Sequence, residues 1–125
     1  MNQARVSKRY YLFEEVLEET PGFAELRRRR PMTELQLLAG LVWATEKGRG
    51  RCPLVKRRSK NDYSEYDHNT RTVALASKHQ NTGGLLHEIA HALGHNDKLT
   101  HGPAFRRRCM RLYKTYGDWS GVVDG

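Results

Sequence analysis

The sequence of 125 residues contains little cysteine. Its two cysteines, Cys52 and Cys109, lie far apart in the chain and belong to no CxxC pair. A disulfide framework needs several cysteines and a zinc knuckle needs closely spaced pairs, so the sequence indicates neither. Two reduced thiols are the expected state of these residues.

Long hydrophobic runs are missing as well. The longest apolar stretches, residues 35–44 and 85–93, are interrupted and about ten residues long, whereas a helix needs about 20 apolar residues to cross a bilayer. Residues 14–19 include four glutamates at the place where a signal peptide would have its apolar core. We therefore expect a cytoplasmic protein that has no membrane-spanning segment.

Acidic residues are outnumbered by basic ones. The chain has 14 Asp and Glu against 22 Lys and Arg, which gives a formal net charge of +8. This excess favours an anionic partner, although basic runs are also common on solvated faces. Tyr63 and Tyr66 follow the basic run of residues 56–58 and could stack on nucleic-acid bases. If the protein binds DNA, we expect it to be associated with the nucleoid. The candidate nucleic-acid contacts are Lys56, Arg57, Arg58, Arg106, Arg107 and Arg108.

The length corresponds to one domain. Apolar residues make up 38% of the chain, which is enough for a modest core. Apolar residues three to five positions apart predict helices, and short β-branched and aromatic runs predict strands. The order is typical of an α+β domain, with a helical part over 1–48, the sheet and active-site helices over 49–116 and a tail over 117–125. The predicted helices cover 8–19, 31–48, 85–96 and 104–116, and the predicted strands cover 53–58, 63–67 and 72–76, the last two as a hairpin.

The second predicted helix is expected to belong to the core. Thr33 and Gln36 fit a capping box near its beginning. The broad apolar face that we expect it to bury comprises Leu37, Leu38, Leu41, Val42 and Ala44.

An HExxH motif, His87-Glu88-Ile89-Ala90-His91, lies on the third predicted helix. Histidines at positions i and i+4 share one face of a helix, so both imidazoles can reach a single metal ion. Glu88 is offset from that face and can act on a water molecule at the metal. The spacing therefore predicts metal-assisted hydrolysis, with His87 and His91 as ligands and Glu88 as the catalytic carboxylate. A purely structural role would leave a buried carboxylate beside two imidazoles without a reason.

The third metal ligand has two candidates. A catalytic zinc ion usually has three protein ligands and keeps a fourth position for water. Asp97 fits the pattern HExxHxxGxxD, in which Gly94 lets the chain turn back toward the metal. His101 stands just before the last predicted helix. The spacing by itself leaves both residues open.

The segment HEIAHALGHNDKLTHGPAF, residues 87–105, resembles the signature of the SprT-like, or Spartan-like, zinc metalloproteases. In that family an HExxH helix is followed by a variable polar loop and by HGP-x-F at the start of the next helix. The resemblance implies a small zincin-like domain that holds one Zn²⁺ with His87, His91 and His101. It also implies that Glu88 is the catalytic glutamate. Manganese or iron in the same site stays an alternative to zinc.

The resemblance implies a peptidase that acts on proteins or peptides. Because the family includes enzymes that degrade proteins crosslinked to DNA, it also implies association with DNA. Two alternatives stay open: a peptidase for one regulatory protein without a DNA role, and a non-catalytic binding module for nucleic acid or protein with structural zinc. A substrate held by strand addition needs an exposed sheet edge, and the candidate edge strand is Thr72, Val73, Ala74, Leu75 and Ala76.

Overall fold

The computed structural model describes residues 24–58, 63–94 and 101–119. The predicted helix 8–19, the candidate ligand Asp97 and residues 120–125 of the predicted tail lie outside the described residues. Over the part that is described, the chain is a small α+β domain with three α-helices and a three-stranded sheet. This confirms the predicted α+β class. No helix in these described ranges has the length and apolar character that crossing a membrane requires.

The helices and strands follow one another in the predicted order. Two short 3-10 helices, η1 and η2, are added at the junctions. In chain order the elements are η1 (Ala24–Arg27), α2 (Met32–Thr45), β1 (Leu54–Arg57), β2 (Glu65–Asp67), β3 (Thr72–Leu75), η2 (Ser77–His79), α3 (Thr82–Leu93) and α4 (Pro103–Tyr116).

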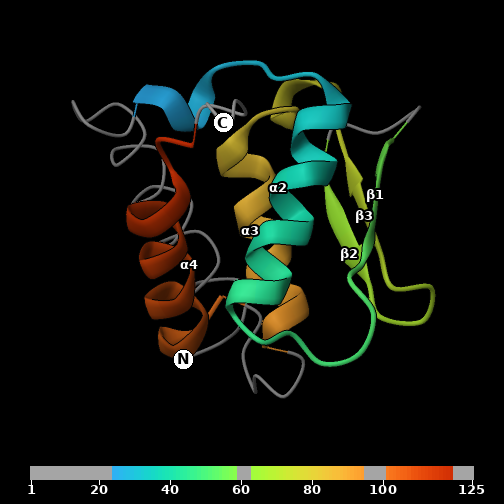
Figure 1. The fold of residues 1–125 in the computed structure, drawn as a ribbon, viewed down its shortest axis with the longest axis vertical. Helices are drawn as coiled ribbons and strands as arrows, with labels where there is room; N and C mark the ends of the chain where they lie inside the picture. The colour runs from blue at the N-terminus through green and yellow to red at the C-terminus, as the bar shows by residue number, and fades with distance from the viewer. Residues whose placement is uncertain (1–23, 59–62, 95–100, 120–125) are drawn as a thin grey trace.

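The helix α3, which carries the HExxH motif, lies at the centre of the fold. It contacts α2, η1, β2 and β3, and it packs against α4 on the side away from the sheet (Figure 1). Asn81 is its N-cap, and the Asn81 side chain accepts a hydrogen bond of 2.7 Å from the amide of Gly84. The helix therefore begins at Thr82, three residues before the predicted start at Leu85, because this cap holds both glycines in the first turn.

Gly84 allows the first turn of α3 to approach the backbone of η2. A Cβ atom at Gly84 would lie 2.2 Å from the carbonyl oxygen of His79, and the backbone there cannot move aside as a flexible side chain could. We expect Gly84→Ala to lower the free energy of unfolding, measured in urea, by about 1–3 kcal/mol, the usual cost of overpacking. Gly40→Ala is the matched control, because a Cβ at Gly40 meets nothing within 4 Å. Equal stability of the two variants would contradict this account.

The sheet has the order β1-β3-β2. β3 pairs in parallel with β1, and Val73 lies opposite Val55 in this pairing. β3 pairs antiparallel with β2, and there Val73 lies opposite Tyr66. The predicted hairpin of β2 and β3 is thus confirmed. The prediction of Thr72–Ala76 as an edge strand is wrong, because Thr72–Leu75 is the central strand and its backbone groups are used by partners on both sides. The outer strands of the described sheet are β1 and β2.

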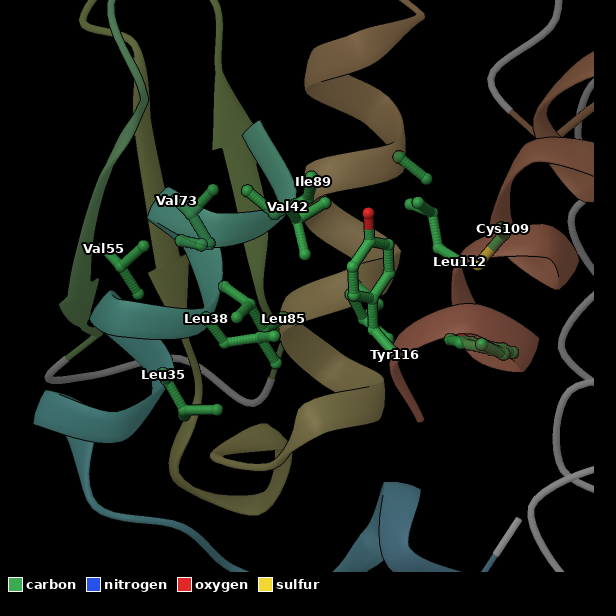
Figure 2. Packing of buried hydrophobic residues seen from close by; sticks show 14 of the residues in the cluster. Leu35, Leu38, Val42, Val55, Val73, Leu85, Ile89, Cys109, Leu112 and Tyr116 are labelled. Carbon is green, nitrogen blue, oxygen red and sulfur yellow. The ribbon is translucent and has the colours of Figure 1, made fainter. Parts of the chain in front are cut away.

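One hydrophobic core extends from the sheet to α4. Figure 2 shows side chains of β1 and β3 next to those of α2, and side chains of α3 between α2 and α4. Fully burying one leucine side chain contributes roughly 1.5–3 kcal/mol, so this continuous packing fixes α3 between its neighbours. The buried residues labelled there include Val55, Val73, Leu35, Leu38, Val42, Leu85, Ile89, Cys109, Leu112 and Tyr116.

The face that α2 buries differs from the predicted one. Leu38 and Val42 are buried as expected, but Leu37 and Leu41 are 65% and 45% exposed. Ala44 is exposed too. Neighbours in the sequence are about 100° apart around a helix, so the broad predicted face could not be buried on one side. The buried face of α2 comprises Leu35, Leu38, Ala39, Val42 and Trp43.

The predicted capping box of α2 is not formed. Its N-cap is Pro31, and no side-chain hydrogen bond caps the helix. The Gln36 side chain instead donates a hydrogen bond of 3.0 Å to the carbonyl of Val55 and so ties α2 to β1.

Cys52 and Cys109 form no disulfide with each other. Cys109 is fully buried in the core on α4. Partial burial raises the pKa of the Cys52 thiol above its ordinary value, because burial disfavours the charged thiolate. Cys52 is therefore not activated as a nucleophile.

Candidate metal centre

The three histidines singled out in the sequence converge in the structure. His87 and His91 lie one turn apart on α3, and His101 comes from the turn that leads into α4. Their ligand nitrogens all lie within 4.8 Å of one another, and among the described residues they form the group that could hold a metal ion. The three rings are nearly equidistant, with centroids 5.0–5.2 Å apart.

The separation of two of these nitrogens fits a single tetrahedral ion. Nε2 of His87 lies 3.3 Å from Nε2 of His101. Two nitrogen ligands at about 2.0–2.1 Å from a tetrahedral zinc ion are also about 3.3 Å apart, so these two rings already have the separation that coordination requires. The third imidazole, that of His91, has its ligand nitrogen within 4.8 Å of the other two, so the three residues could hold one metal ion.

Glu88 is buried beside this centre and is not one of its ligands. Its exposed fraction is 5%, close to the 8% of His87 and the 6% of His101. The group of converging ligand atoms comprises the histidines and leaves Glu88 out. The catalytic role predicted for Glu88 stays a prediction.

Phe105 is a part of the site for which the sequence predicted no role. Its ring stacks on His91, with centroids 4.2 Å apart and planes inclined by 18°, and it meets His87 and His101 edge to face. Phe105 therefore packs against all three imidazoles and holds their orientation. The signal for this contact is its position four residues after His101, in the first turn of α4.

Arg108 links α4 to the C-terminal end of α3. Its Nη1 donates a hydrogen bond of 3.2 Å to the carbonyl of Ala90, one of the last carbonyls of α3. The same arginine was predicted as a nucleic-acid contact. This hydrogen bond gives its guanidinium group a structural role between the two helices.

The surroundings of His91 keep its imidazole neutral. Burial is the largest cause that lowers the pKa of His91, and together with the neighbouring His87 and His101 it brings the pKa to about 2. Arg108 and His68 make smaller contributions to this lowering. A histidine must be neutral to ligate a metal ion, so this environment favours the ligating form.

The lowered pKa of His91 has a consequence for stability. In the metal-free protein His91 binds its proton at a lower pH than in the unfolded chain, where its pKa is about 6.5. The unfolded state therefore binds more protons below about pH 6.5, and the free energy of unfolding should fall as the pH decreases from there. Urea denaturation of the metal-free protein from about pH 7.5 to about pH 4.5 measures this slope. His91→Gln should flatten it, and an unchanged slope in that variant would contradict the assignment.

The predicted nucleic-acid contacts lie in two separate groups. Lys56 and Arg57 are exposed on β1, whereas Arg106 and Arg107 lie on α4, across α2 and α3 from the sheet (Figure 1). Arg58 forms an ion pair with Glu65 and lies over the ring of Tyr63, 4.7 Å from its centroid. The structure therefore does not bring the two basic runs together into one surface.

Two further histidines and two tyrosines lie outside the converging group of three histidines. His68 is exposed on the turn between β2 and β3, and Nδ1 of His79 lies 3.0 Å from the hydroxyl of Ser64. Tyr113 is packed in the core, and the Tyr116 hydroxyl donates a hydrogen bond of 3.0 Å to Glu46. Tyr113 is thus part of the core, and Tyr116 ties α4 to the residue that follows α2.

Comparisons with known proteins leave the site to be interpreted from its own geometry. No protein-family model matches the chain, and no curated protein or solved structure matches it significantly.

Proposed function

We propose that the chain is a zinc-dependent endopeptidase of the SprT-like type with a zincin-like arrangement of sheet and active-site helix. The observation that carries this proposal is the convergence of His87, His91 and His101, with Glu88 buried next to His87. Three protein ligands leave one position of a tetrahedral ion for water, which is typical of catalytic sites, whereas structural sites have four protein ligands.

Zinc is the proposed ion, with one bound per chain by the three histidines. Imidazole is a donor that suits zinc, whereas magnesium, calcium and manganese prefer carboxylate and carbonyl oxygens. When bound, zinc lowers the pKa of a water molecule and polarises the carbonyl group of the scissile bond.

Glu88 is the proposed general base and then general acid. It takes a proton from the water molecule while the water oxygen adds to the carbonyl carbon of the peptide bond. It returns this proton to the amide nitrogen as the carbon–nitrogen bond breaks, so the products are a carboxyl group and an amine. Burial favours this role, because proton transfer and charge stabilisation are stronger where bulk water is excluded.

The substrate polypeptide is proposed to bind as an added strand along β2. As an outer strand of the described sheet, β2 has backbone groups that a further strand can pair with. It contacts α3 and leads into the turn that carries His68, whose charge acts on His91. β1, the other outer strand, packs on α2. Pairing of this kind reads the backbone more than the side chains, so we expect low sequence specificity.

Cleavage of an unfolded protein by the zinc-loaded chain tests this function. The matched control is Glu88→Gln, which keeps all three histidines. We expect fragments with the wild type and none with the variant or after chelation of the metal. No cleavage by a chain that binds zinc would contradict the proposal and favour the non-catalytic module.

The same assay tests the association with DNA when single-stranded DNA is added at low salt, where phosphate contacts are strongest. Cleavage that depends on DNA supports a protease for DNA-bound proteins. Cleavage at the same rate without DNA favours a peptidase that has no DNA role.

A further inference from the structure

A second site lies where the ends of α2 and α3 meet α4. It is a cavity of about 310 Å³, lined from α4 by Arg108 and Arg111 and from the turn after α2 by Glu46, Lys47 and Arg49. This volume is at the lower end of the range for ligand pockets, so it suits a small group more than a polymer backbone.

The charge of this cavity is positive on balance. Its acidic residue, Glu46, is ion-paired with Arg111 and accepts a hydrogen bond from the Tyr116 hydroxyl. The ends of α2 and α3 add about half a negative charge each. The four cationic side chains exceed these negative charges by about two units, so the cavity attracts an anion.

The turn that carries two of the cations is held rigidly. Arg71 donates hydrogen bonds to the carbonyls of Arg49 and Arg51, the latter 2.9 Å long. The Trp43 indole donates one of 3.0 Å to the carbonyl of Gly50. Because the backbone of the turn is fixed, little conformational entropy is lost when a ligand binds.

Lys47 occupies a backbone position that favours glycine. Its φ of +56° is in the left-handed region, which is unfavourable for residues with a Cβ atom. Lys47 lines the cavity, and its positive φ carries a cost in backbone energy. Replacing it with glycine should therefore remove the charge without unfolding the turn.

The cavity and the three histidines share the C-terminal part of α3. Ala92 and Leu93, which directly follow His91 on α3, belong to its lining. Arg108 joins the two sites, because it lines the cavity and hydrogen-bonds to Ala90, the residue before His91. The backbone that lines the cavity is therefore continuous with the turn of α3 that carries a proposed metal ligand.

We propose that this cavity binds an acidic side chain of the substrate polypeptide, whose carboxylate is held by Lys47, Arg49 and Arg108. The inference rests on the proposed peptidase function and adds a preference for a glutamate or aspartate near the scissile bond. Carboxylates are the natural partners of guanidinium groups, which bind them with two parallel hydrogen bonds.

Binding can be measured without turnover by NMR titration of the zinc-loaded full chain. The probe is N-acetylglutamate N-methylamide, with the glutamine analogue as its neutral match. We expect the acidic probe to shift the amide signals of residues 47–49 and 92–93 saturably and the neutral one not to. Equal shifts with both probes would overturn the proposal. It would also be overturned if a short single-stranded DNA shifted these signals and the acidic probe did not.

Two double variants locate the effect. Lys47→Gly with Arg49→Gln should weaken binding of the acidic probe at least about tenfold while the melting temperature is maintained, because each lost charged hydrogen bond is expected to cost about that factor. Arg106→Gln with Arg107→Gln removes the same charge from α4 outside the cavity and should leave binding unchanged. Equal weakening in both variants would show a general charge effect and overturn the assignment.

Hydrolysis separates this inference from the proposed function. For two peptides that differ by glutamate or glutamine near the scissile bond, the wild type should favour the acidic one, and the variant in Lys47 and Arg49 should lose this preference. If both peptides are cleaved equally by the wild type, the cavity assignment fails and the peptidase stands. If neither is cleaved while the acidic probe still binds, the peptidase proposal fails.

Discussion

Replacing Glu88 with glutamine should lower the rate of peptide hydrolysis by about 10²–10⁴-fold, the usual contribution of a general base. The glutamine amide has nearly the same shape as the carboxylate, but it cannot accept the proton of the attacking water. Because Glu88 is not among the converging ligand atoms, the zinc affinity should change little. The measurements are kcat/KM on an unfolded protein substrate and the zinc content per chain.

Glu25→Gln is the control for this variant. Glu25 is an exposed residue of η1 that pairs with Arg28 at 3.1 Å, so the substitution makes the same change in charge away from the metal centre. It should hydrolyse at the wild-type rate. If Glu88→Gln lost zinc together with activity, Glu88 would be a ligand, and if it kept full activity, Glu88 would have no catalytic role.

Replacing His101 with alanine should weaken zinc binding more than about 100-fold. Loss of a group that only orients a ligand costs about 10–100-fold in metal affinity, and loss of a ligand should cost more. Nε2 of His101 lies 3.3 Å from Nε2 of His87, the separation expected across one tetrahedral ion. Competition with a chromophoric chelator measures the affinity.

Two further variants make this prediction specific. His68→Ala removes an exposed histidine that lies outside the converging group, so zinc affinity should stay at the wild-type value. Asp97→Asn removes the other candidate ligand and should also leave the affinity unchanged. A large loss in Asp97→Asn together with a small loss in His101→Ala would contradict the three-histidine centre.

The parts of the structure that depend on local spacing were predictable from the sequence. The i, i+4 spacing of His87 and His91 fixes their common face as soon as the segment is helical. The turn between residues 67 and 72 brings β2 and β3 together over a short distance in the chain, so their hairpin follows from the sequence.

The parts that depend on distant contacts were not predictable in the same way. β1 pairs with β3 and skips β2, and no local pattern indicates which strand becomes central, so the edge strand was misassigned. Likewise, Leu37 and Leu38 are equally apolar, and only the packing of α2 against β1 and α3 decides which one is buried.

The candidate site shows the same division. His101 lies ten residues after His91, and the spacing alone does not distinguish it from Asp97 as the third ligand. In the structure, Nε2 of His101 lies next to Nε2 of His87. The stacking of Phe105 on His91 and the link from Arg108 to Ala90 depend on how α4 packs on α3. The sequence supplies these side chains, but the packing of the two helices determines their roles.

X-ray absorption at the zinc edge, on the wild type and on Asp97→Asn, tests most directly whether the centre is an open three-histidine site. We expect three imidazole ligands and one further light-atom ligand from solvent, with identical spectra for the two proteins. Fewer than three imidazoles, or a spectrum that changes in Asp97→Asn, would mean a different or closed coordination sphere and would contradict a catalytic zinc centre.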